Sequence, residues 1–222
     1  MPIEDHFRWK VDRELVQSFE SNDQFQVTRV GWAVHGFTHI DSPRHIDANG
    51  YTSSDFDLQN LVGEACVIDL THVKDNQKID RTILEDANHH LRSQDIVLLK
   101  TNWDQRKSVK SETFWKTAPY LSRDACEYLL TQDIKALGVD FPQDKPIRNL
   151  LDGEVRPMNE FVSHDILLMN GIPLIEYLCN LGSVPHKRVQ LFALPLNIPN
   201  SDGCPARVIA MPLVKKDRCR GH

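Results

Sequence analysis

The chain has 222 residues, of which 41% are hydrophobic and 26% charged, and its formal net charge at pH 7 is −5. A chain of this length can bury a sizeable core without disulfides, and no apolar run approaches the ~18 residues of a membrane span. The acidic balance leaves no basic footprint for nucleic acid. We therefore expect a small molecule as the partner, and neither nucleic acid nor membrane.

Five cysteines are scattered along the chain, and none forms a C-x-x-C pair. An odd number of isolated cysteines predicts reduced thiols in a cytoplasmic protein, and it disfavours a zinc site built on thiolates. The first residues are polar, so we expect no targeting segment.

Taken in chain order, residues 1–24 are charged and irregular, and they predict an arm-like N-terminal segment. Alternating or continuous apolar runs then predict strands at 25–34, 65–70, 95–100, 134–140, 172–178, 189–196 and 207–211. The first of these is expected to be half-buried. Helical spacing predicts helices at 79–90, 121–130 and 165–171, the last of them ending at Gly171. No linker divides the chain, so we expect one mixed α/β domain over residues 1–222, with a frayed tail at 215–222.

Residues 35–45 concentrate side chains that bind metals. The stretch contains His35, His39, Asp41 and His45. Neutral imidazole with carboxylate suits zinc or manganese under reducing conditions. Fully extended, the stretch would spread these groups over roughly 33 Å. The chain must therefore fold back, and Gly36 and Pro43 are suitable turning points. Six other histidines are expected to be solvated or hydrogen-bonded side chains: His6, His72, His89, His90, His186 and His222.

A second group of polar residues is Ser163-His164-Asp165, followed by Glu176. Glu176 stands in an apolar run, where an ionised carboxylate is costly unless it is paired or bound to a cation. Arg188 or Arg207 could pair with it, and a metal is the alternative. Four aromatic residues are candidates for a substrate pocket, with core packing as the alternative for each: Trp32, Phe37, Trp103 and Phe141.

The cyclase-like family of metal-dependent hydrolases, which includes bacterial kynurenine formamidase and isatin hydrolase, has the signature His-x-Gly-Thr-His-x-Asp-x-Pro-x-His. This chain resembles it at every position but one of His35-Gly36-Phe37-Thr38-His39-Ile40-Asp41-Ser42-Pro43-Arg44-His45. Phe37 stands where the family has glycine. The family's later His and Glu, twelve residues apart, fall on His164 and Glu176.

The resemblance implies a swivelling β/β/α fold, assembled as a homodimer or larger oligomer. It implies one or two Zn²⁺ or Mn²⁺ ions. The first would be held by His35, His39 and Asp41. In members that bind two, the second would be held by Asp41, His164 and Glu176. The resemblance also implies that His45 is the general acid/base. Near the start, Met1-Pro2-Ile3-Glu4-Asp5 matches only the Asp of the family's aromatic-Pro-Gly-Asp element, which counts against formylkynurenine as the substrate.

The chemistry of these groups agrees with hydrolysis. A divalent metal lowers the pKa of bound water towards ~7, and histidine, with an ordinary pKa of ~6.5, can carry the protons. We predict a metal-dependent hydrolase that cleaves the C–N bond of a small amide or cyclic amide, of the arylformamide or isatin-like type. The alternatives are a cyclase, dehydratase or lactone hydrolase acting on a polyketide-like substrate, and a non-catalytic metal-binding scaffold.

Overall fold

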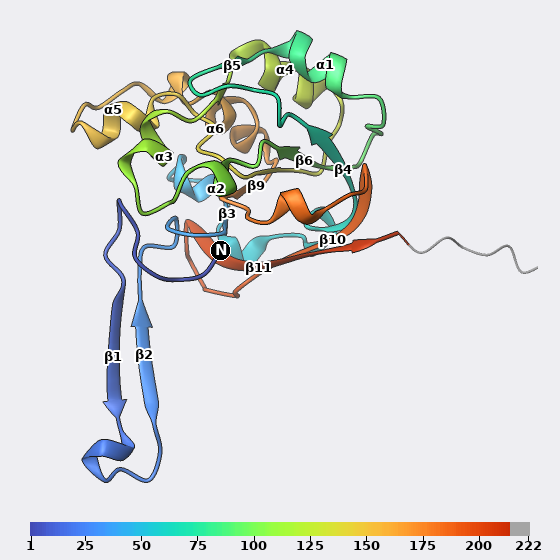
Figure 1. Ribbon diagram of the computed structural model, residues 1–222. Helices are drawn as coiled ribbons and strands as arrows, with labels where there is room; N and C mark the ends of the chain where they lie inside the picture. The colour runs from blue at the N-terminus through green and yellow to red at the C-terminus, as the bar shows by residue number, and fades with distance from the viewer. Residues whose placement is uncertain (214–222) are drawn as a thin grey trace, which may run out of the picture.

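A closed barrel forms the centre of the molecule (Figure 1), seen in a computed structural model that describes residues 1–213. Within that range seven strands close the barrel in the order β10-β11-β3-β9-β8-β6-β4. Their bounds are β3 His39–Asp41, β4 Val62–Asp69, β6 Ile96–Lys100, β8 Ala136–Val139, β9 Leu174–Glu176, β10 Arg188–Pro195 and β11 Gly203–Pro212. The run β4-β6-β8-β9 is parallel, and the other neighbours are antiparallel.

The parallel strands are buried on both faces, which explains why their sequences are continuous apolar runs. In β4, Ala65 and Val67 belong to a core cluster shared with β10, whereas Cys66 and Ile68 belong to a second cluster shared with the helices. Successive side chains of a strand point to opposite faces, so one strand supplies both clusters. The strands predicted at 65–70, 95–100, 134–140, 172–178, 189–196 and 207–211 are confirmed as parts of the barrel.

Six α-helices and a small sheet cover the barrel within the described residues. The helices are α1 Arg81–Ala87, α2 Trp103–Arg106, α3 Glu112–Lys116, α4 Arg123–Thr131, α5 Ile147–Leu151 and α6 Val162–Ile166. The small sheet pairs β5 Lys78–Ile79 with β7 Tyr120–Leu121 in parallel. Asp80 caps α1 by accepting a hydrogen bond from the backbone N–H of Ile83, and Ser122 stands at the N-cap of α4. The helices predicted at 79–90 and 121–130 are therefore present, but the first is shorter than predicted: it spans Arg81–Ala87, and Ile79 lies in β5.

The helix predicted at 165–171 was misplaced. The α-helix α6 ends at Ile166, and a separate 3-10 turn, Leu168–Asn170, leads to Gly171 at φ 77°. The glycine does end the segment, but the helix begins three residues earlier than predicted, at Val162. As a result His164 lies on the helix instead of in front of it.

A two-stranded hairpin, β1 Asp12–Gln17 paired with β2 Val27–Gly31, projects away from the barrel (Figure 1). We call residues 12–31 the arm. The prediction of a half-buried strand at 25–34 was wrong in its burial, because every residue of β2 is exposed. Residues 1–24 are also more regular than predicted, since they contain β1. Apolar alternation indicates a strand but does not say what covers its apolar face. Within the described residues, no helix is long and apolar enough to cross a membrane.

Candidate metal centre

Strand β3 places two candidate ligands on one face of the barrel sheet. His39 and Asp41 are two residues apart, so their side chains point the same way. On the neighbouring strand β9, Glu176 is the register partner of His39. Directly opposed residues of paired strands have side chains within contact distance on the same face. Glu176, a distant residue in the sequence, is thereby brought beside the first stretch.

The chain folds back before and after β3, as its length requires. A turn closed by the Gly36 N–H and the Ala33 carbonyl, 3.0 Å apart, returns His35 to the strand. After the strand, the 3-10 turn Pro43–His45 carries His45 towards the same spot. Both predicted turning points, Gly36 and Pro43, therefore lie in turns.

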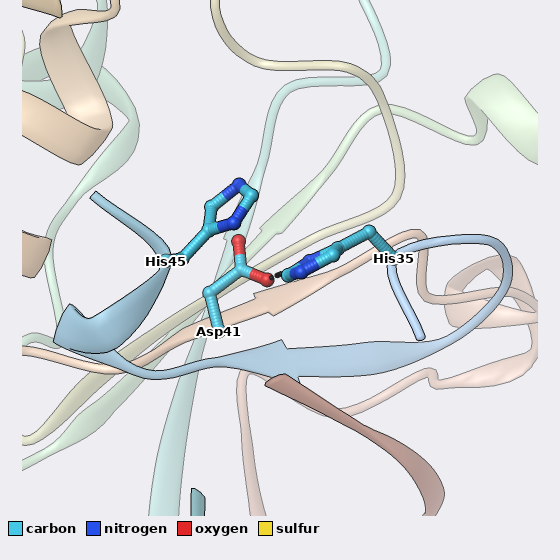
Figure 2. A group of neighbouring side chains, drawn as sticks. All are labelled: His35, Asp41 and His45. Atoms are coloured by element: carbon cyan, nitrogen blue, oxygen red, sulfur yellow. Dashed lines mark hydrogen bonds and ion pairs between the residues drawn. The ribbon is translucent and has the colours of Figure 1, made fainter. Parts of the chain in front are cut away.

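Asp41 is the centre of the cluster. Its Oδ1 lies 2.7 Å from His35 Nδ1 and 3.0 Å from His39 Nε2, and its Oδ2 lies 3.5 Å from His164 Nε2. The Glu176 carboxylate lies 3.7 Å from both His39 Nε2 and His164 Nε2. The structure thus brings together all five residues predicted as ligands. Figure 2 shows Asp41 between the rings of His35 and His45.

Two buried polar atoms at this centre, His39 Nε2 and Asp41 Oδ2, have no hydrogen-bond partner among residues 1–213. Leaving a buried polar group unsatisfied costs about 1–3 kcal/mol. Both atoms lie within the group of candidate ligand side chains, and a divalent cation bound there would coordinate both of them. Imidazole nitrogens and carboxylate oxygens are donors that zinc and manganese accept. The residues present therefore fit a metal.

Each of the three candidate histidine ligands has one nitrogen turned to Asp41 and the other held by an oxygen. The Nδ1–H of His39 donates to the Phe37 carbonyl at 2.7 Å, and the Nδ1 of His164 lies 2.6 Å from Asp144 Oδ2. On His35, Nε2 lies 2.8 Å from Asp202 Oδ2. Partners on the far nitrogen fix the tautomer and orientation of metal-binding histidines. Phe37, in place of the family's glycine, contributes through its backbone.

Sequence reasoning missed Asp144, Asp202 and Gln143. Asp144 accepts hydrogen bonds from both the backbone N–H and the hydroxyl of Ser163, at 2.9 and 2.6 Å. Gln143 donates its side-chain amide to Ser163 Oγ at 3.1 Å and to the Glu176 carboxylate. Both residues lie in the loop after the buried strand β8, which ends at Val139. Polar residues at the carboxyl end of a parallel strand are a signal that could have indicated them.

The arginine alternative for Glu176 does not hold. The Arg188 guanidinium pairs with Asp95 at 2.6 Å and with Glu64 at 2.7 Å, and Arg207 is exposed. Burial and the neighbouring Asp41 carboxylate raise the pKa of Glu176. Burial opposes ionisation of Asp41 too, but His39 and His35 hold the pKa of Asp41 well below its usual range.

Burial and neighbouring carboxylates shift the pKa values of three of the histidines in different directions. Burial opposes protonation of His35, but the Asp41 and Asp202 carboxylates outweigh it and raise its pKa to about 9. Burial likewise opposes protonation of His164, and the hydrogen bond to Asp144 reverses this, so the pKa of His164 is raised. At His45 burial dominates and lowers the pKa to about 4, against the pull of Asp41. With its pKa at about 4, His45 is neutral at pH 7.

Two of the four pocket candidates are core residues. Trp103 and Phe141 are fully buried in the helix-side cluster, and the Trp103 indole N–H donates to the Phe114 carbonyl at 2.9 Å. Core packing, the alternative stated for them, describes these two. Phe37 is buried with its ring edge-on to His6, at 5.1 Å between centroids, and Trp32 is partly exposed beside it.

Comparison with known proteins gives the same picture. The family model described as "Putative cyclase" matches residues 1–143. A kynurenine formamidase of Bacillus cereus is 30% identical over 200 residues, which cover 90% of this chain and 87% of that protein. A predicted metal-dependent hydrolase from Bacillus stearothermophilus is similar in structure, with a TM-score of 0.68, 27% identity and coverage of 90% of this chain and 86% of that one.

Isatin hydrolase A from Labrenzia aggregata shares the fold, with a TM-score of 0.76 and 20% identity over 91% of this chain and 83% of that one. The predicted mixed α/β fold is confirmed by this likeness. The predicted class of activity, metal-dependent hydrolysis of a non-peptide C–N bond, is confirmed by the named relatives together with the His/Asp/Glu cluster. The family match over more than half of the sequence means that this chain belongs to the cyclase family.

Proposed function

We propose that this chain hydrolyses the C–N bond of a small amide or cyclic amide, of the arylformamide or isatin-like type. The residues that would hold one or two divalent ions are His35, His39, Asp41, His164 and Glu176. The observation that carries the proposal is their convergence on Asp41, where His39 Nε2 and Asp41 Oδ2 are buried without hydrogen bonds. A divalent ion bound there supplies Lewis acidity, which lowers the pKa of water and stabilises an oxyanion.

His45 is the residue that we assign to proton transfer. Its ring stacks on His35 with centroids 3.9 Å apart, and its side chain is 32% exposed, whereas the side chains of His39 and Asp41 are 1% exposed. His45 therefore lies between the buried carboxylates and the solvent, where a substrate can reach its ring. Neutral at pH 7, it can accept a proton from the attacking water and return that proton to the leaving nitrogen.

The test begins with protein purified without added metal. We expect elemental analysis to find zinc or manganese, and His39→Ala and Asp41→Ala to lose both the metal and the hydrolysis of a panel of arylformamides, isatins and cyclic imides. His45→Ala should keep the metal and lose about 10²–10⁴-fold in kcat. Full metal retention in both ligand variants would overturn the assignment.

Two readouts separate the alternatives. A hydrolysis product contains one more water than its substrate, whereas a cyclase or dehydratase product does not. If His45→Ala left every activity in the panel unchanged, the scaffold alternative would be favoured. The same elemental analysis decides between zinc and manganese, since this donor set accepts either.

We also propose that the protein works in the reducing cytoplasm as a homo-oligomer, a dimer or larger. Four cysteines within the described residues are free thiols. The arm supports the assembly: Leu15, Val16, Phe19 and Phe25 are between 52% and 64% exposed. A two-stranded hairpin alone is marginally stable in water. Beside β11, a cavity of about 670 Å³ lined by apolar residues such as Leu178, Leu191 and Val208 offers a surface for a second copy.

A further inference from the structure

We propose that Asp202 is a positioning residue, which holds His35 as a ligand and His45 as the proton carrier through one carboxylate oxygen. Its Oδ2 lies 2.8 Å from His35 Nε2 and 3.6 Å from His45 Nδ1. No other carboxylate in the described residues lies within ion-pair distance of both rings. The inference rests on the proposed function, because it concerns the same centre.

The backbone fixes Asp202 although its side chain is 47% exposed. The Asp202 carbonyl accepts hydrogen bonds from the backbone N–H of Ser42 at 3.1 Å and from the Ser42 hydroxyl at 2.9 Å. The next residue, Gly203, is the register partner of Asp41. Asp202 is thus anchored to Ser42 through its own carbonyl, and its neighbour Gly203 is paired with Asp41. An aspartate on a free surface loop would have no such constraint.

Gly203 explains how the His35 ring comes close enough. A Cβ at Gly203 would lie 2.8 Å from His35 Cε1 and 3.1 Å from the Ile40 carbonyl oxygen, and contacts below 3.0 Å do not occur for real side chains. Only glycine lets the imidazole lie against β11 with its Nε2 next to Asp202. The pair Asp202-Gly203 therefore combines an acceptor with the space for the ring that it holds.

The contact decides which nitrogen of His35 faces Asp41. Asp202 gives the Nε2–H of His35 an acceptor on the far side of the ring, so Nδ1 is the nitrogen that faces Asp41 and that could give its lone pair to a cation bound there. The same oxygen, Asp202 Oδ2, lies 3.6 Å from Nδ1 of His45. Figure 2 shows one His45 ring nitrogen beside the Asp41 carboxylate and the other pointing away from it. Asp202 thus favours a His45 orientation that leaves one nitrogen available to a substrate.

The experiment measures metal binding by the apoprotein, with zinc in competition with a chromophoric chelator. Asp202→Ala should weaken zinc binding about 10–100-fold, as the loss of such a partner does at other metal-binding histidines. Asp202→Glu should recover part of the loss. Asp86→Asn, an exposed aspartate on α1, is the matched control and should bind zinc like the wild type.

Cobalt-loaded protein and kinetics give two independent readouts. The visible absorption of Co²⁺ should change in Asp202→Ala, because His35 is no longer held. With zinc saturating, the kcat of Asp202→Ala on an amide of the panel should stay below that of the wild type, because His45 has lost its partner. Wild-type zinc affinity, cobalt spectrum and kcat in Asp202→Ala would overturn the inference alone. A wild-type protein that binds neither zinc nor cobalt would overturn the proposed function, and this inference with it.

Discussion

The barrel centre and the arm depart from ordinary burial in opposite ways. The centre buries polar side chains, and the arm exposes apolar ones. At the centre, His39 and Asp41 are fully buried, and two of their polar atoms have no hydrogen bonds. On the arm, Phe19 and Phe25 are more than 60% exposed. Buried unpaired polar groups and exposed apolar patches are the two informative departures from ordinary burial. We propose on this ground that both regions are completed from outside the chain, the centre by a cation and the arm by the apolar surface of another copy.

The largest expected effect comes from Glu176→Gln, which removes a buried charge from the centre. At a zinc concentration of 1,000 Kd, binding should stabilise the wild type by ~4 kcal/mol, and the variant should lose most of this gain. Without metal the variant should be more stable than the wild type, since burial and the neighbouring Asp41 carboxylate disfavour ionised Glu176. Urea unfolding with zinc and with chelator measures both. A metal-free variant less stable than the wild type would contradict the charge argument.

Next in size is Asp144→Asn, which leaves the ligands in place and weakens the support of His164. We expect about 10–100-fold weaker zinc binding, because the amide cannot serve all the donors that the carboxylate accepts. Asp165→Asn, next along α6 but paired with Arg123 at 2.8 Å on the surface, is the control. Equal zinc affinities for the two variants would show that His164 does not need its partner.

His6, at the base of the arm, should add a pH dependence. Its Nδ1 accepts the backbone N–H of Arg8 and Trp9, its ring packs on Phe37 and Trp115, and burial lowers its pKa to about 4. Because the unfolded chain binds this proton near pH 6.5, His6 should cost stability as the pH falls from 6.5 towards 4.

In His6→Phe that part of the dependence should disappear. The difference in unfolding free energy between wild type and variant should change by on the order of 1–2 kcal/mol between pH 7 and pH 5. Urea unfolding at the two values measures it, and parallel pH curves for the two proteins would speak against a buried neutral His6.

The smallest effect on the stability of the single chain is expected for the arm. Leu15→Ser combined with Phe25→Ser should shift the protein to monomers in analytical ultracentrifugation, while metal content stays unchanged. The free energy of unfolding of the monomer should change by less than about 0.5 kcal/mol, because both side chains are exposed. Val155→Ser, at a residue of the barrel domain that is 92% exposed, is the control. An unchanged sedimentation coefficient in the double variant would count against the arm as an interface.

Sequence reasoning was most successful where a residue's role depends on its own segment. Strands β4, β6 and β8 are buried on both faces, so their apolar runs indicated them. His35, His39 and Asp41 lie within one short segment, and their spacing indicated a metal. Asp144 and Asp202 lie in loops, which carry no periodic pattern, and the histidines that they contact are 20 and 167 positions away in the sequence. The exposure of the arm was unpredictable for a related reason: alternation shows an apolar face, not the surface that covers it.

The pairing of β3 with β9 has a consequence for kinetics. Thr38, which precedes β3, donates its hydroxyl to the carbonyl of Tyr177, which follows β9, across 139 positions of sequence. A cation bound by both Asp41 and Glu176 would link the same two segments in the folded chain, and the segments could separate only after one of them had released the ion. The chelator-treated protein should therefore unfold faster than the metal-loaded protein. The ion would then slow the opening of the barrel in addition to its role in hydrolysis.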